Sequence, residues 1–123
     1  MAFTYTDKRL SDAMIAEAQA GIMVQGVIEN RGASQGALVP LACAKLSVET
    51  DGNKYTMHHK TIIIDDSTVI TGSFNFTATA DNANDDNILI INNAPTVASL
   101  YLQEFARVYR LGKAADLTSL KCK

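Results

Sequence analysis

Four polar side chains lie in two closely spaced pairs near the middle of the chain, and their types suit the binding and attack of a phosphate. His58 and Lys60 form the first pair, and Ser73 and Asn75 form the second. An imidazole can attack phosphorus or carry a proton near neutral pH. An ammonium, a hydroxyl and an amide can each donate hydrogen bonds to the non-bridging oxygens of a phosphate. The two pairs therefore predict a site that binds and attacks a phosphate.

A predicted β-hairpin positions the two pairs. Residues 56–64 and 67–71 are rich in Thr, Val and Ile, which is typical of strands, and Asp65 and Asp66 between them suit a tight turn. If the hairpin closes at these aspartates, the two strands are antiparallel neighbours and the two pairs can converge on one patch. Gly72, at the end of the second strand, allows the backbone to come close to a ligand.

Strand alternation predicts which side chains share a face. His58 and Lys60 are two residues apart, so they point to the same face of the strand, whereas His59 points to the other face. Ser73 and Asn75 repeat the same spacing on the second strand. We therefore expect His59 to have no part in the site.

The rest of the chain alternates strands with helices. Residues 1–5 look like the end of a strand, and a helix that begins after Thr6 or Asp7 and ends at Gly21 leads to a buried strand at 22–28, an opening that favours a parallel pair. The further predicted elements are a helix at 37–45, strands at 46–49 and 87–92, a polar loop at 77–86, and a helix from Pro95 to Gly112 with Val97, Leu100, Tyr101, Phe105 and Val108 on its apolar side. This order predicts an α/β domain with a mixed β-sheet flanked by helices.

Composition indicates an ordinary globular domain. The chain has 123 residues, of which 47% are hydrophobic and 20% charged, so it suffices for one domain with one core. The net charge of −2 gives no broad basic field, and any nucleic-acid binding must depend on a local patch. No apolar run is long enough to predict a transmembrane segment, and no signal peptide is visible.

Cys43 and Cys122 are too few for a disulfide scaffold and are not spaced as a metal site. We expect two unpaired thiols in a reducing compartment, with the cytoplasm slightly favoured over other locations.

The residues from His58 to Asn75 follow the pattern HxK(x)4D(x)6GSxN, which resembles the HKD motif of the phospholipase D superfamily at every fixed position. The segments MAFTYTD, MHHK and GSFNFT, and the closing NDDN before a strand and a helix, extend the resemblance over nearly the whole chain. They are similar to the small single-motif branch, which contains bacterial endonucleases and mitochondrial phospholipase-D-like proteins. The resemblance implies a single phospholipase-D-like domain over residues 1–123, lacking the N-terminal helix and half-strand that family members usually have.

The resemblance also implies a mechanism. In this superfamily two motifs meet at one active site: one histidine attacks phosphorus to form a phosphohistidine, and the other protonates the leaving oxygen and then activates water. Carried over, His58 is the nucleophile in one copy of a homodimer and the general acid and base in the other. Lys60 and Asn75 bind the phosphate, and Ser73 assists through its hydroxyl. This route needs no metal and no cofactor.

Three further residues have implied roles. The motif aspartate, Asp65, is expected to be structural, as is Gly72. A downstream carboxylate usually orients the histidine ring. That position falls on Asp86, with Asp85 as the competitor.

We therefore expect a metal-independent phosphodiesterase, and in particular a nuclease that acts on DNA or RNA. Three alternatives stay open: a phospholipase D that hydrolyses phospholipids, the C-terminal half of a two-motif enzyme, and a non-catalytic scaffold domain. The presence of both His58 and Lys60 argues against the scaffold, because non-catalytic family members typically lose one of them.

Overall fold

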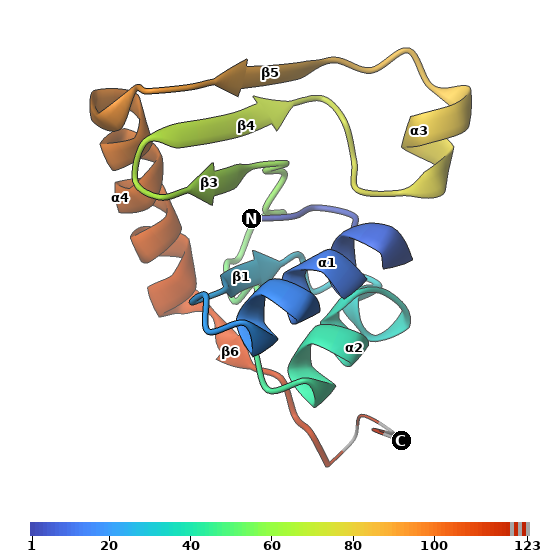
Figure 1. Ribbon diagram of the computed structural model, residues 1–123. Coiled ribbons are helices and arrows are strands. Elements are labelled where there is room, and N and C mark those ends of the chain that lie inside the picture. Colours follow the sequence, from blue (N-terminus) through green and yellow to red (C-terminus); the bar gives the residue numbers. More distant parts are fainter. Residues whose placement is uncertain (119, 121, 123) are drawn as a thin grey trace.

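The computed structural model describes residues 1–118, 120 and 122, and shows two small sheets with helices around them. In Figure 1, α1 and α2 lie in front of the lower sheet, α4 runs along the side of both sheets, and α3 lies beyond the end of the upper sheet. The lower sheet has the strand order β1-β2-β6 and the upper sheet β3-β4-β5. The helices are α1 (Lys8–Gln19), η1 (Ala33–Gln35), α2 (Leu38–Cys43), α3 (Ala78–Ala83) and α4 (Pro95–Leu111), and the strands are β1 (Gln25–Ile28), β2 (Ser47–Thr50), β3 (Ile62–Ile64), β4 (Thr68–Gly72), β5 (Ile88–Ile91) and β6 (Lys113–Ala114).

The N-terminal segment joins the two sheets. Ala2 forms a parallel bridge with Ile28 at the end of β1 and an antiparallel bridge with Lys60 just before β3. The backbone N–H of Phe3 donates to the carbonyl oxygen of His59 at 2.8 Å, and that of Thr61 donates to Met1 at 2.9 Å. The predicted parallel opening and the predicted mixed sheet flanked by helices are both confirmed.

Helix α1 begins and ends where the sequence predicts. The Asp7 carboxylate caps it by accepting from the backbone N–H of Leu10 at 3.1 Å, and Gly21 follows it with a φ of +95°. The strand expected from residue 22 starts only at Gln25. Ile22 is still part of the helix end, because its N–H bonds to the carbonyl oxygen of Glu17 at 3.0 Å. The predicted start of this strand, at residue 22, was therefore wrong by three residues.

Helix α4 packs on β3 and β4 of the upper sheet and on β1 of the lower sheet. Pro95 occupies its first turn, and Ala98 and Val108 are completely buried. Leu100, which we expected on the apolar side, is 62% exposed. The stripe of buried and half-buried residues runs through Ala98, Tyr101, Phe105 and Val108, at spacings of three and four residues. Leu100 lies outside this stripe.

The polar loop predicted at 77–86 contains a short helix, α3. Its N-cap is Thr77, whose hydroxyl oxygen accepts from the backbone N–H of Ala80 at 3.1 Å. Ala80 is buried, and Asp81 forms an ion pair with Arg9 of α1 at 2.8 Å. A capping threonine and two contacts therefore suffice to fold a segment whose composition favours a loop.

The hairpin predicted around Asp65 and Asp66 is present, but it is shorter and its register differs. Both aspartates have left-handed backbone angles, with φ of +49° and +52°, and the N–H of Ser67 bonds to the carbonyl oxygen of Ile64 at 3.2 Å. Ile64 pairs with Thr68, so the loop holds three residues, 65–67, instead of two. Residues 59–61, expected within the strand, bond to the N-terminal segment instead.

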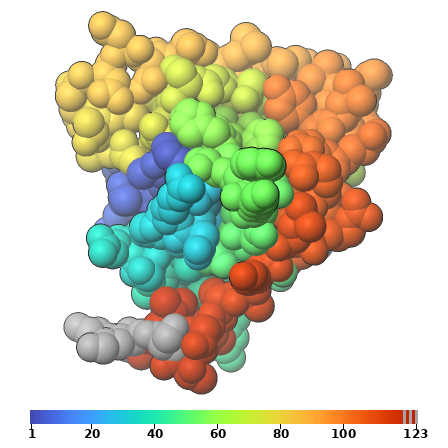
Figure 2. Space-filling model, turned by 180° about the vertical axis from the view of Figure 1, so that it is seen from behind, coloured from blue at the N-terminus to red at the C-terminus, as the bar shows by residue number. Residues whose placement is uncertain are grey.

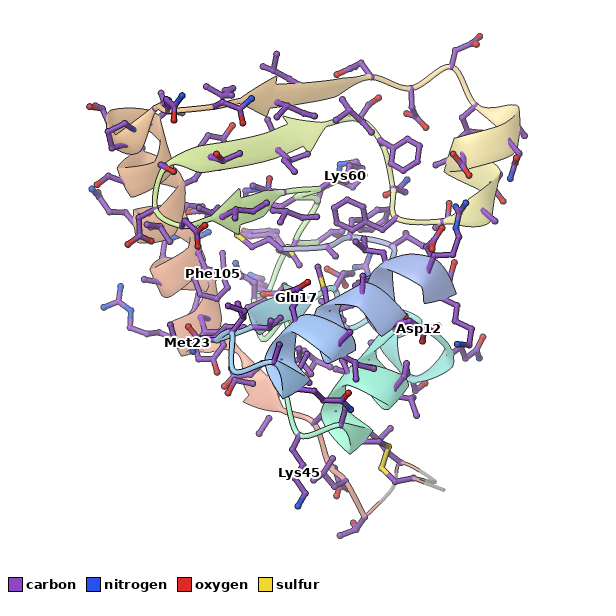
Figure 3. The ribbon with its side chains drawn as sticks, in the orientation of Figure 1. Asp12, Glu17, Met23, Lys45, Lys60 and Phe105 are labelled. Carbon is purple, nitrogen blue, oxygen red and sulfur yellow. A yellow bond between two sulfur atoms is a disulfide. The ribbon has the colours of Figure 1, made fainter. Side chains whose placement is uncertain are left out.

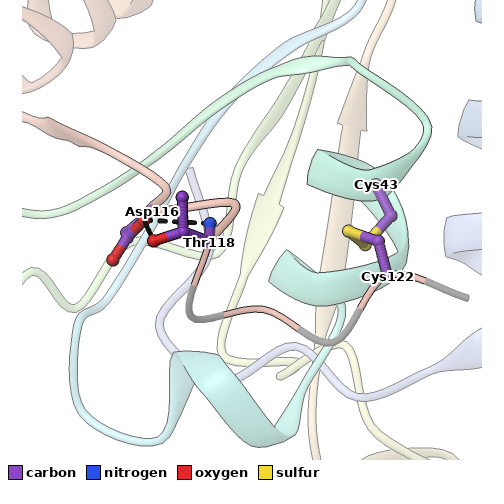
Figure 4. Close-up of a disulfide and its surroundings, with 4 residues drawn as sticks. All are labelled: Cys43, Asp116, Thr118 and Cys122. Atoms are coloured by element: carbon purple, nitrogen blue, oxygen red, sulfur yellow. Dashed lines mark hydrogen bonds between the residues drawn. A yellow bond between two sulfur atoms is a disulfide. The ribbon is translucent and has the colours of Figure 1, made fainter.

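Cys43 of α2 forms a disulfide with Cys122, with their Cα atoms 5.5 Å apart (Figure 4). The prediction of two unpaired thiols was wrong, because 79 residues separate two cysteines that the fold brings together. Between β6 and this bond, the Asp116 carboxylate accepts from the N–H and the hydroxyl of Thr118 at 3.0 and 2.6 Å.

Strand β5 is the outer strand of the upper sheet, and Ile88, Leu89 and Ile90 on it are more than half exposed. In the part of the chain that the structure describes, none of the helices has the length and apolar character needed to cross a bilayer.

Candidate active site

The structure places His58 and Lys60 in contact, immediately before β3. The Lys60 Nζ atom lies 3.3 Å from both ring nitrogens of His58 and donates to the His58 carbonyl oxygen at 3.1 Å. His58 is exposed, whereas Lys60 is only 8% exposed. Figure 3 shows Lys60 beside the start of β3. The same-face prediction for this pair is confirmed.

Phe3 contacts both members of this pair. Its ring centroid lies 4.3 Å from that of His58, with the planes tilted by 52°, and the Lys60 Nζ lies 4.7 Å from it. The N-terminal segment thus supplies an aromatic face to an imidazole and an ammonium at once. We did not predict a role for Phe3 from the sequence.

Burial lowers the pKa of Lys60 from its usual value, and the negative charge of Asp86 acts in the opposite direction. A buried ammonium that must bind a phosphate needs such compensation, because desolvation favours its neutral form. Asp86 therefore lies close enough to Lys60 to help to keep it charged.

Ser73 and Asp86 are joined directly. The Ser73 hydroxyl donates to Asp86 Oδ1 at 2.7 Å and accepts from the backbone N–H of Asn87 at 3.0 Å. The other Asp86 oxygen accepts from the Asn84 side chain at 3.2 Å. These contacts fix the Asp86 carboxylate between Ser73 and Lys60, and its expected role in orienting the His58 ring stays a prediction.

The side chain of Asn75 has unused hydrogen-bonding capacity. Its Oδ1 atom is buried without a partner among the described residues. A buried amide oxygen without a donor costs free energy, and a half-turn of the amide exchanges oxygen for the NH2 group. The amide can therefore present a donor to a bound phosphate.

Gly72 allows the chain to bring Ser73 to the site. The hydroxyls of Thr61 and Thr71 lie 3.2 Å apart, which shows that the β3–β4 register continues and that Lys60 lies opposite Gly72. Regular alternation would then turn Ser73 away from Lys60. Gly72 has a φ of +151°, which interrupts the strand directly before Ser73. A Cβ at this position would overlap the carbonyl oxygen of Asn87.

His59 points to helix α4, as alternation predicts. Its Nε2 atom lies 3.0 Å from Glu104 Oε1, and Glu104 is also bound by Arg107 at 2.7 Å. Hydrogen bonding by Arg107, followed by that of His59, lowers the pKa of Glu104 to about 2 in spite of its partial burial. His59 thus ties the segment that carries His58 and Lys60 to α4.

Several aspartates of the chain could in principle bind a metal ion, but they lie in different parts of the fold. Asp65 and Asp66 are exposed in the hairpin loop, and Asp81 is paired with Arg9. Within the described part of the chain, no three His, Cys, Asp or Glu side chains are grouped so as to hold a metal ion.

Glu29 is a second residue that the sequence did not reveal. It is 4% exposed, and its Oε2 atom accepts from the backbone N–H of Met57 at 2.8 Å, one residue before His58. The only sequence signal is an acidic residue directly after the apolar strand predicted at 22–28. Glu29 holds the start of the segment that carries His58 and Lys60.

The fold and the site define a phospholipase-D-like domain. Residues 1–109 match the family model described as "Cardiolipin synthase, PLD-like domain". The chain belongs to this family, and the resemblance inferred from the HKD motif is confirmed.

Particular relatives agree with this assignment. The chain superimposes on the crystal structure of a phospholipase D family member, Nuc from Salmonella typhimurium, with a TM-score of 0.88 and 33% identity over 94% of this chain and 78% of that one. It is 37% identical over 106 residues to a phospholipase D of Rickettsia bellii and 33% identical over 110 residues to a mitochondrial cardiolipin hydrolase of Xenopus tropicalis, covering 85% and 88% of this chain and 52% of each relative. NucT from Helicobacter pylori shares the fold at 20% identity and a TM-score of 0.78. The chain spans about half the length of the phospholipase D and the cardiolipin hydrolase. Both names are those of phosphodiester hydrolases, the enzyme class expected from the sequence.

Proposed function

We propose that the chain is a metal-independent phosphodiesterase that acts through a phosphohistidine intermediate. The observation that carries this proposal is the contact of the exposed His58 ring with the buried Lys60 ammonium. An exposed imidazole can reach an incoming phosphorus, and the adjacent cation supplies the charge that binds its oxygens.

In the proposed reaction, a ring nitrogen of His58 forms a bond to phosphorus while the bond from phosphorus to the leaving oxygen breaks. A second imidazole gives its proton to that oxygen. The second imidazole then takes a proton from water, whose oxygen attacks phosphorus and breaks the nitrogen–phosphorus bond. A phosphomonoester leaves, and both imidazoles are regenerated.

The remaining polar groups stabilise charge. Lys60 and Asn75 donate to the non-bridging oxygens, and Ser73 assists from its bond with Asp86. Asp86 also offsets the desolvation of Lys60 through its charge. These roles need no metal ion.

The second imidazole comes from a second copy of the chain. The only other histidine, His59, is held by Glu104 on the far side of the strand. We propose a two-fold symmetric homodimer in which one His58 attacks and the partner's His58 donates the proton. Analytical ultracentrifugation across a concentration series tests this: specific activity should rise with the dimer fraction. A fully active monomer would contradict the composite site, whereas an inactive monomer would favour the half of a two-motif enzyme.

A nucleic acid is the proposed substrate, because the likeness to Nuc extends over 78% of that chain, whereas only about half of the phospholipase D and cardiolipin hydrolase relatives is covered. Phospholipid hydrolysis is the second candidate, favoured by the names of those relatives. The test is a product assay of the purified chain on single-stranded DNA, double-stranded DNA, RNA and cardiolipin vesicles, with EDTA throughout. Cleavage of a nucleic acid would support the proposal, and cleavage of cardiolipin alone would show that a phospholipid is the substrate instead. Activity lost in EDTA and restored by magnesium would contradict the metal-independent route.

A further inference from the structure

We infer that Phe3 is a positioning residue for both proposed catalytic groups, holding the His58 ring in place and stabilising the charge of Lys60. The inference rests on the proposed function and adds to it a residue outside the HKD motif. Its basis is one aromatic ring that lies 4.3 Å from the His58 ring and 4.7 Å from the Lys60 Nζ.

The backbone fixes the place of this ring. Ala2 is bridged on one side to Ile28 and on the other to Lys60, and the N–H of Phe3 donates to the carbonyl oxygen of His59 at 2.8 Å. The segment that carries the ring is therefore bonded to the same residues whose side chains the ring contacts. Its position relative to the site does not depend on a flexible loop.

The Phe3 ring limits the motion of the His58 side chain. The His58 side chain is exposed, and among the described contacts the imidazole meets only Phe3 and the Lys60 ammonium. A nucleophile must be held near its attack geometry, since a displacement of about 1 Å can cost about 100-fold in rate. A planar ring tilted by 52° restricts rotation of the imidazole in a way that an aliphatic side chain does not.

For Lys60, the ring replaces lost hydration. Lys60 is only 8% exposed, and the groups around its ammonium are the His58 ring and carbonyl oxygen, the Asp86 carboxylate and the face of Phe3. The negative face of an aromatic ring attracts a cation, most strongly where water is excluded. Without it, the neutral amine becomes more favourable, and a neutral amine binds phosphate poorly.

The test compares Phe3→Leu with Phe3→Tyr, which keeps the aromatic face, and with a matched control, Phe105→Leu. Phe105 is a half-buried aromatic residue of α4 whose ring contacts that of Tyr109. The substrate is bis(p-nitrophenyl) phosphate, a small diester, measured as pH profiles of kcat and kcat/KM.

For Phe3→Leu, kcat should fall about tenfold with little change in KM, and the alkaline limb of the profile should move down by about 0.5 to 1 pH unit. Phe3→Tyr should behave like the wild type. Phe105→Leu should lower the unfolding temperature and leave the profile in place. A Phe3→Leu variant with an unmoved alkaline limb and kcat within twofold of wild type would overturn the inference.

A second measurement needs no turnover. The Lys60 ammonium is titrated by NMR in the wild type, Phe3→Leu and Phe105→Leu, and only Phe3→Leu should lower its midpoint. An unchanged midpoint contradicts the role of Phe3 whatever the substrate is. A lowered midpoint in a protein that cleaves no diester contradicts the proposed function while the role of Phe3 in holding the charge stands.

Discussion

Replacing each of the two adjacent histidines by alanine should separate activity from stability. His58→Ala removes the proposed nucleophile and proton carrier, so turnover should fall at least about 1000-fold. His59→Ala removes a side chain on the opposite face and should leave turnover within a few-fold of wild type. The two variants differ by one position in the chain, so each is the control for the other.

For stability the order should be reversed: His59→Ala should destabilise the fold more than His58→Ala. His59 loses a half-buried hydrogen bond to Glu104, 3.0 Å long, and its removal should cost about 1 kcal/mol, or about 3–5 °C in unfolding temperature. His58 is exposed and loses mainly its contact with the Phe3 ring, which we expect to cost less than about 1 kcal/mol.

The assay is hydrolysis of a fluorescent oligonucleotide in EDTA, paired with thermal unfolding of the same samples. Circular dichroism at the assay temperature shows whether each variant is folded. A His59→Ala variant as inactive as His58→Ala, with both folded, would refute the assignment of faces. Full activity of His58→Ala would refute the phosphohistidine route itself.

Three further predictions concern stability and the site. Reduction of Cys43–Cys122 should lower the free energy of unfolding by about 2–4 kcal/mol, below the roughly 4.5 kcal/mol that loop entropy gives for the 79-residue separation, and urea unfolding with and without reductant measures it. Gly72→Ala should cost about 1–3 kcal/mol and reduce turnover at least about tenfold, because its φ of +151° is strained for alanine and the neighbouring backbone must shift; unfolding and kinetic assays of one sample test both effects. The pKa of Glu104 is lowered to about 2, so its ionised form stabilises the fold fully above about pH 4.5, and this contribution is lost as the pH falls toward 2. Glu104→Gln should therefore be about 1 kcal/mol less stable than wild type at pH 7 and nearly equal to it near pH 2, as thermal unfolding across this range would show.

Local patterns were enough to predict much of the fold. Asp7 and Gly21 bound α1 because a carboxylate cap and a left-handed glycine act within one turn of the chain. Pro95 starts α4 for a similarly local reason. Strand alternation, a property of two residues, correctly separated His58 from His59.

Contacts between distant segments could not be read from such patterns. Cys43 and Cys122 are 79 positions apart, and only the folded chain brings the C-terminal tail to α2. Glu29 bonds to Met57 across 28 residues, and no spacing rule connects a carboxylate after one strand with an amide before another. In the sequence Phe3 is an ordinary apolar residue of a half-strand, and only the structure shows its ring against His58 and Lys60.

The hairpin was expected to bring Ser73 to the face of His58 by strand alternation, and the structure shows a different hairpin geometry. A two-residue turn at Asp65 and Asp66 would have put Ser73 on the face of His58 by alternation alone. The observed loop includes Ser67, which shifts the register by one residue and would turn Ser73 to the wrong face. Gly72 compensates, because its positive φ interrupts the strand one residue before Ser73, whose hydroxyl then bonds to Asp86. The fixed glycine of the motif therefore has a structural reason in this chain: it corrects the direction of Ser73 after a three-residue loop.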